Sequence, residues 1–132
     1  MKRNIISVIV FFLVLGVPTS VLAVSRNTTY NMYGGIYSQA FTMNKGKYAR
    51  VKISPKSYPS YAKNLNVQLE KKNWWGYSNV SSYSAVSAKS GGYSTYKKAP
   101  EENFYRFYIW NPITPETTYK YKGDLVVYYN IN

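Results

Sequence analysis

The feature that most constrains the fold is an alternation of apolar and polar residues with a period of two. It runs through YARVKI (48–53), NLNVQLE (64–70) and NFYRFYIWN (103–111), while DLVVYYNI (124–131) is a continuous β-branched and aromatic run. Successive side chains of a strand point to opposite faces, so each alternating segment predicts a strand with one buried face. The residues predicted to point inward are Ala49, Val51, Ile53, Leu65, Val67, Leu69, Tyr105, Phe107 and Ile109.

Glycine and proline separate these segments. NKGK (44–47) predicts a tight hairpin turn in which Gly46 takes a positive φ, and prolines mark loops at 54–63 and 111–123. SGG (90–92) and KKAPEE (97–102) also interrupt the pattern, weaker strands are expected at 35–43, 74–80 and 91–96, and no segment after the first 23 residues has a helical stripe. About seven short strands with frequent turns predict an all-β fold, a small antiparallel β-sandwich, with a small β-barrel as the alternative.

The first 23 residues have the pattern of a cleaved signal peptide. A basic start, MKRN, precedes an apolar run at 5–17, and Val21 and Ala23 occupy the −3 and −1 positions of a small-residue cleavage site. The apolar run is short for a membrane span, which needs roughly 20 residues. We therefore expect a secreted protein whose mature part, 24–132, is one domain without a stable transmembrane segment, and whose first residues, 24–31, are loose.

The chain is strongly basic. It has 17 Lys and Arg against 5 Asp and Glu; without Lys2 and Arg3 of the leader the count is 15 against 5, or +10. Residues 24–100 hold twelve of these cations and one acid, Glu70. Such a charge favours anionic partners: an anionic polymer, an acidic glycan or an anionic lipid surface, with nucleic acid bound only non-specifically. The alternative is that the lysines only keep a tyrosine-rich protein soluble.

Catalysis is not predicted. The chain has no histidine and no cysteine, which excludes the common nucleophilic triads and removes the usual ligands of zinc, copper and iron, so we expect neither a metal nor a cofactor. A glycosidase would need two converging carboxylates. Glu101 and Glu102 are adjacent in KKAPEEN and, like Glu70, lie beside lysines, so solvated ion pairs are the simpler interpretation.

Aromatic residues interleaved with cations indicate a binding surface. The chain has 16 tyrosines and 3 tryptophans, whose rings have a polar tip and suit contacts with sugars, bases and lipid interfaces. If 48–53 and 103–111 shared a sheet, their outward residues, including Phe104, would form one basic-aromatic platform. In KKNWWGYS (71–78), a strand would bury one tryptophan at the edge of the core and expose the other. The candidate ligand-binding residues are Tyr48, Arg50, Lys52, Lys71, Lys72, Trp74, Trp75, Arg106, Tyr108 and Trp110.

These observations favour a secreted, non-enzymatic, basic binding protein for an anionic or glycan-rich extracellular surface such as a cell wall or matrix. One alternative is a secreted bacteriocin-like antagonist that acts on a competitor's envelope, although no amphipathic helix for membrane insertion is present in the sequence pattern. A further alternative is a structural protein that assembles through strand edges.

Overall fold

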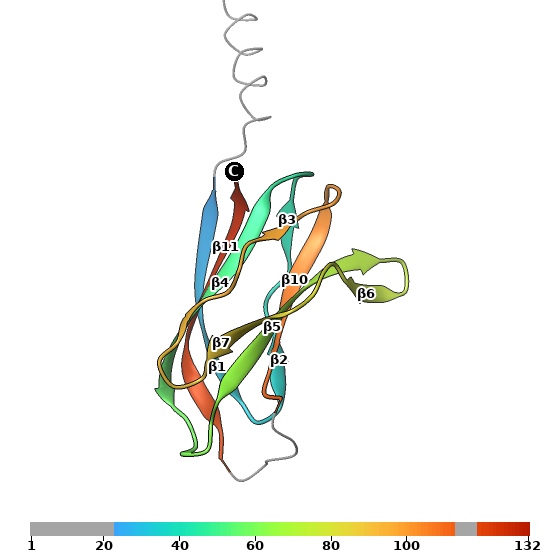
Figure 1. The fold of residues 1–132 in the computed structure, drawn as a ribbon. Helices are drawn as coiled ribbons and strands as arrows, with labels where there is room; N and C mark the ends of the chain where they lie inside the picture. The colour runs from blue at the N-terminus through green and yellow to red at the C-terminus, as the bar shows by residue number, and fades with distance from the viewer. Residues whose placement is uncertain (1–22, 113–118) are drawn as a thin grey trace, which may run out of the picture.

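The computed structural model describes residues 23–112 and 119–132. Within these ranges the chain forms eleven strands and no helix, and the strands build two antiparallel sheets that face each other (Figure 1). The predicted β-sandwich is confirmed, and the two sheets do not close into a barrel. No helix in the described ranges is long and apolar enough to cross a membrane. The predicted leader, apart from Ala23, lies outside the described residues.

Each sheet combines strands from distant parts of the chain. Sheet A has the order β1-β11-β4-β8, with β9 also pairing β4; sheet B has the order β2-β10-β5-β6, with β3 pairing β10 and β7 pairing β5. The strands of sheet A are β1 (Val24–Met32), β4 (Tyr48–Ser57), β8 (Gly92–Tyr93), β9 (Lys97–Lys98) and β11 (Tyr121–Ile131). Those of sheet B are β2 (Gly35–Tyr37), β3 (Phe41–Met43), β5 (Asn64–Asn73), β6 (Gly76–Asn79), β7 (Ser84–Ser87) and β10 (Asn103–Trp110).

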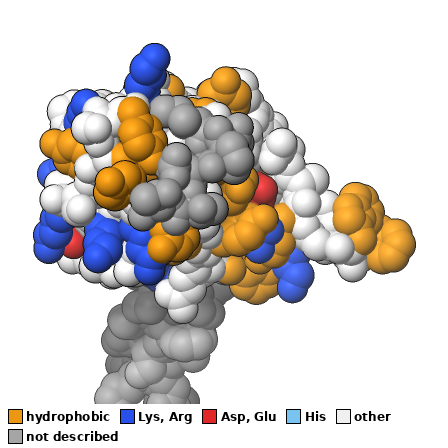
Figure 2. Space-filling model, turned by 90° about the horizontal axis from the view of Figure 1, so that it is seen from below, with side chains coloured by type: hydrophobic (Ala, Val, Ile, Leu, Met, Phe, Trp, Pro, Cys, Tyr) orange, Lys and Arg blue, Asp and Glu red, His pale blue; other side chains and the backbone are white. Residues whose placement is uncertain are grey.

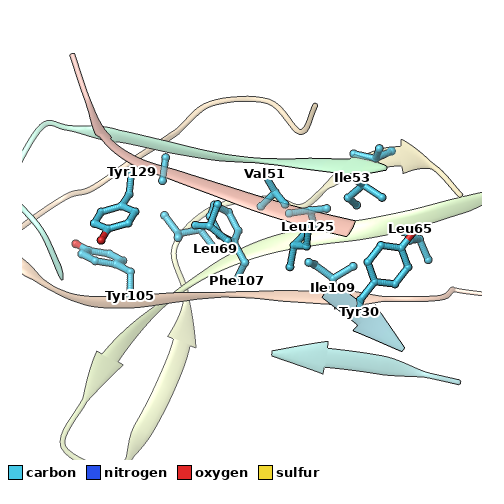
Figure 3. Close-up of a cluster of buried hydrophobic side chains, with 14 of the residues drawn as sticks. Tyr30, Val51, Ile53, Leu65, Leu69, Tyr105, Phe107, Ile109, Leu125 and Tyr129 are labelled. Atoms are coloured by element: carbon cyan, nitrogen blue, oxygen red, sulfur yellow. The ribbon is translucent and has the colours of Figure 1, made fainter. Parts of the chain in front are cut away.

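The core fills the space between the sheets (Figure 3). Val51, Ile53 and Leu125 from sheet A face Leu69 and Phe107 from sheet B, and all are at most 1% exposed. Every residue predicted to point inward is buried, because the alternating pattern matches the pleat of its strand. Aromatic rings fill one end of the core: the Phe41 ring lies 4.8 Å from that of Tyr129 and 5.7 Å from that of Phe107.

The first residues of the predicted mature chain are a strand rather than a loose segment. β1 pairs with β11 along its whole length, from Val24 opposite Tyr129 to Met32 opposite Tyr121. Its polar sequence gives little strand signal because seven of its nine side chains are exposed at the edge of the sheet. The expectation for 24–31 is therefore corrected.

The turn at 44–47 is also not a hairpin. Gly46 has the expected positive φ, 85°, but β3 pairs β10 in sheet B whereas β4 pairs β11 in sheet A. The turn therefore carries the chain from one sheet to the other, and Gly46 N donates a hydrogen bond to Ala99 O over 2.8 Å.

Strand β5 is more buried than its alternation predicts. Asn66 and Gln68, expected to point to solvent, are 7% and 4% exposed. Gln68 Nε2 donates to Ser81 O in the connection between β6 and β7, and Asn66 lies opposite Trp110 in the register. A returning segment and a large neighbouring ring thus cover this part of the outer face.

Candidate binding surfaces

The structure divides the ten candidate residues among three places. Tyr48, Arg50 and Lys52 lie on β4 in sheet A, whereas Arg106, Tyr108 and Trp110 lie on β10 in sheet B. The single platform proposed from the sequence is therefore wrong, since the two stripes face away from each other on opposite sides of the sandwich. The remaining candidates, Lys71, Lys72, Trp74 and Trp75, belong to the β5–β6 hairpin.

The outer surface of sheet A is basic and aromatic, and we call it the basic face. In Figure 2, most visible Lys and Arg side chains gather on the side where Figure 1 places this sheet. Its one acid among the described residues, Asp124, is already 3.5 Å from Lys56 Nζ. The residues of the basic face are Tyr48, Arg50, Lys52, Lys56, Tyr93, Tyr96, Lys98, Lys122, Asp124 and Tyr128.

Arg50 organises the centre of the basic face. Its guanidinium carbon lies 3.9 Å from the ring centre of Tyr93 and 4.4 Å from that of Tyr96, both from the β8–β9 segment. Its Nε is buried and has no hydrogen-bond partner among the described residues. The two tyrosines remain about half exposed. Cation–π contacts thus hold the rings in place while leaving part of each available to a ligand.

The outer surface of sheet B has a continuous stack of side chains, which we call the aromatic ladder. Tyr37 and Tyr108 stack at 4.7 Å, Tyr108 and Trp110 at 5.0 Å, and Tyr83 meets Trp110 edge-on at 5.4 Å. Arg106 continues the stack, because its guanidinium lies 3.7 Å from the ring of Tyr37 and 3.9 Å from that of Tyr77. The members in order are Tyr77, Arg106, Tyr37, Tyr108, Trp110 and Tyr83.

Each inner ring of the ladder contacts two neighbouring side chains. Tyr37 is covered by Arg106 and Tyr108, and Tyr108 is covered by Tyr37 and Trp110. Arg106 is also neutralised by Glu70, whose Oε1 is 2.7 Å from Arg106 Nε. Burial, then the neighbouring Tyr37 and Glu70, raise the pKa of Tyr108. The ladder therefore stabilises sheet B through its internal contacts, while Tyr37 remains 52% exposed.

The β5–β6 hairpin projects from the body of the sandwich and ends in hydrophobic side chains (Figures 1 and 2). Asn73 pairs with Gly76, so Trp74 and Trp75 form the turn and lie outside both strands. They are 90% and 66% exposed and meet edge-to-face at 5.1 Å. The expectation that one of them would be buried is wrong, because a turn does not impose the two-faced geometry of a strand.

The two lysines behind the tryptophans have different surroundings. Lys71 Nζ lies 3.4 Å from Glu101 Oε1, while Lys72 Nζ lies 5.7 Å from the ring centre of Phe104. Phe104 is half exposed. The hairpin thus adds an exposed aromatic group to the surface, but its positive charge is partly balanced.

The residues that complete these surfaces were not predicted. Tyr93, Tyr96 and Lys98 come from the short strands and turn after the SGG break, and Tyr37 and Tyr83 come from other short segments. The side chains of these residues contact residues far away in the chain, so no local pattern could identify them. The count of tyrosines was the available signal, but it gave no positions.

The described residues contain no group of three or more His, Cys, Asp or Glu side chains that could hold a metal ion. Glu70 and Glu101 each pair with a cation, Arg106 and Lys71, and lie on different elements. What the surface offers is cations and rings. Fold and surface together define the chain as a small all-β sandwich with a basic, aromatic exterior.

No family model and no curated protein matches the sequence. Among solved structures, the fold is similar to a periplasmic inhibitor of g-type lysozyme, PliG, from Aeromonas hydrophila, with 13% identity, a TM-score of 0.45, and coverage of 81% of this chain and 85% of that one. It is also similar to endospore appendages of Bacillus, a family of disulfide-linked pili, with 10% identity, a TM-score of 0.42, and coverage of 83% and 89%. Likenesses of this degree assign the chain to neither group.

Proposed function

We propose that the protein is a secreted, non-enzymatic binding protein that attaches through its basic face to an anionic or glycan-rich surface outside the cell. The observation that carries the proposal is the composition of that face, where Arg50, Lys52, Lys98 and Lys122 have no carboxylate partner among the described residues. The lysines supply long-range attraction, and the half-exposed rings of Tyr93 and Tyr96 supply short-range contact with sugars.

The test compares two variants with the same net charge. Lys52→Glu/Lys122→Glu reverses two charges on the basic face, whereas Lys63→Glu/Lys89→Glu reverses two exposed lysines outside it. Residues 24–132 of each are incubated with purified bacterial cell wall, phosphatidylglycerol vesicles and DNA over a range of salt concentrations. We expect the basic-face variant to lose binding to cell wall and the control to keep most of it. Equal losses would mean that only net charge matters, and the proposal would then fail.

Salt separates specific contact from general attraction. Interactions between exposed charges weaken strongly once the screening length falls to about 8 Å near physiological ionic strength. Binding that uses the rings as well as the charges is expected to persist at moderate salt. Loss of binding to all three materials together as salt rises would contradict a role for the rings.

The projecting hairpin favours a second candidate, an antagonist that acts on a competitor's envelope. Tryptophan is enriched at membrane–water interfaces, and Trp74 and Trp75 are exposed at the end of an arm. This candidate predicts a blue shift of tryptophan fluorescence on phosphatidylglycerol vesicles and release of an entrapped dye. Both effects would disappear in Trp74→Ala/Trp75→Ala. An unshifted spectrum with intact vesicles would rule it out and leave the binding function unaffected.

A further inference from the structure

A hollow of about 680 Å³ opens beside the basic face, at the edge where the two sheets separate. Its wall on the sheet A side includes β9 and Tyr96, and its wall on the other side includes Val80 and Ser81, which follow β6. We call it the Lys97 hollow, because Lys97 is its most buried cation. The space is large enough for a single sugar ring with a charged substituent.

Lys97 is held inside the edge of the sandwich. It lies opposite Ala49, a core residue, so its side chain points between the sheets, and it is 7% exposed. Its Nζ donates a hydrogen bond to Ser82 O over 2.6 Å. An ammonium group has three donors, and this carbonyl is the one acceptor that the described residues provide for it. Burial lowers the pKa of Lys97, as expected for a cation without a nearby anion.

The rest of the lining matches an anion attached to a ring. Lys45 and Lys98 add two further cations, and no Asp or Glu lines the hollow among the described residues. The rings of Tyr48 and Tyr96 meet edge-on at 6.3 Å on one side, and Pro100 adds an apolar surface. Cations on the rim attract an anion, and an aromatic or apolar wall packs against the face of a sugar.

We propose that the Lys97 hollow binds an anionic sugar unit, with its phosphate or carboxylate at Lys97 and its ring against Tyr96. An incoming anion would provide the partner that the buried ammonium lacks, and Lys45 and Lys98 would neutralise its remaining charge. This inference rests on the proposed function and deepens it, since it names the unit of an anionic glycan that the protein recognises. The basic face would hold the polymer, and the hollow would select the unit.

The test is a titration of the ¹⁵N-labelled protein, residues 24–132, followed by NMR. The probes are glucose 6-phosphate, glucuronate and uncharged glucose. We expect saturable shifts of the amides of 45–48, 80–81 and 96–99 with at least one charged sugar, and much smaller shifts with glucose. Shifts with the phosphate sugar alone would identify a phosphate-bearing glycan, and shifts with glucuronate alone would identify a carboxylate-bearing one.

Lys97→Met removes the charge and keeps most of the volume, so the side chain still fills its place between the sheets. It should weaken binding by about tenfold or more, as expected for a lost charged hydrogen bond, while Lys63→Met, which loses the same charge elsewhere, should leave binding unchanged. If Lys97→Met does not fold, Lys45→Met at the exposed rim serves instead and should also weaken binding more than Lys63→Met.

The inference is overturned if neither charged sugar gives saturable shifts, if glucose shifts the same amides equally, or if the hollow and control variants weaken binding to the same extent. Failure of the proposed function gives a different pattern. In that case Lys52→Glu/Lys122→Glu and the control Lys63→Glu/Lys89→Glu would bind cell wall equally, whatever the sugar titration shows.

Discussion

Replacing Arg106 by alanine is expected to destabilise the fold by about 3 kcal/mol. The two guanidinium–ring contacts, at 3.7 and 3.9 Å, contribute about 0.5 to 1 kcal/mol each. The substitution also leaves Glu70 without its partner, and the Glu70 side chain is only 12% exposed. That loss lies between the small effect of a surface pair and the large effect of a buried one, at about 1 to 2 kcal/mol.

Thermal unfolding followed by circular dichroism measures the effect. For a domain of this size, about 3 kcal/mol corresponds to a fall in Tm of about 12 °C. The Tm of Arg106→Lys should fall by about half as much, because lysine keeps a charge beside Glu70 but loses the planar stacking. Arg50→Ala is the matched comparison on the basic face: Arg50 also contacts two rings but has no carboxylate, so its loss should cost about 1 to 2 kcal/mol.

Two results would refute this reasoning. An Arg106→Ala protein with a stability within about 1 kcal/mol of the parent would mean that the ladder does not hold sheet B together. If the double variant Glu70→Gln/Arg106→Ala were as unstable as the sum of the two single variants, the pair would not be coupled. Either outcome would return the ladder residues to the list of candidate ligand contacts.

Three further predictions concern other parts of the fold. Burial and the charge of Asp124 raise the pKa of Tyr30 to about 12, so the phenol binds its proton more tightly in the folded state than in the unfolded state. The free energy of unfolding should therefore fall by about 2 to 3 kcal/mol as pH rises from 10 to 12. Urea unfolding at a series of pH values should show a smaller decline in Tyr30→Phe, and an equal decline would contradict the assignment. Gly91→Ala should destabilise the fold by about 2 kcal/mol or more, because Gly91 has φ +76° and an added Cβ would lie 2.3 Å from Ile53 O. Gly34→Ala is the control, since an added Cβ there would have nothing within 4 Å. Equal stabilities of the two variants in denaturant unfolding would contradict this account. Trp74→Ala/Trp75→Ala should change stability by less than about 0.5 kcal/mol in the same assay, since both rings are outside the core; a larger loss would mean that the hairpin packs against the body.

The sequence predicted the buried faces well and the partners of each strand poorly. The inward residues of β4, β5 and β10 follow from a local alternation that any pleated strand obeys. Whether β4 and β10 share a sheet depends instead on pairings between distant segments, which local alternation does not encode. The platform expected from the sequence therefore became two separate surfaces.

The candidate site shows the same division. Arg50 and Lys52 were identified as outward cations from their positions in β4, and the basic face contains both. KKAPEE separates two predicted strands, so local alternation gives Lys97 no inward or outward face, and only its pairing with Ala49 turns its side chain inward. The tryptophans were misjudged for a local reason: the sequence does not state whether an aromatic pair lies in a strand or in its turn.

The position of β11 at the centre of sheet A has a consequence for how the chain folds. β11 lies between β1 and β4, so β1 has no strand to pair with until Tyr121–Ile131 are present. The chain through Ile131 must therefore leave the ribosome before sheet A is complete, and one hydrogen-bonding edge of β4 stays unpaired until then. Pairing over such long separations is slow, which gives chaperones time to engage an unfolded chain. A chain cut short before β11 should be unable to complete the sandwich, and it would expose the strand edges that lead to aggregation.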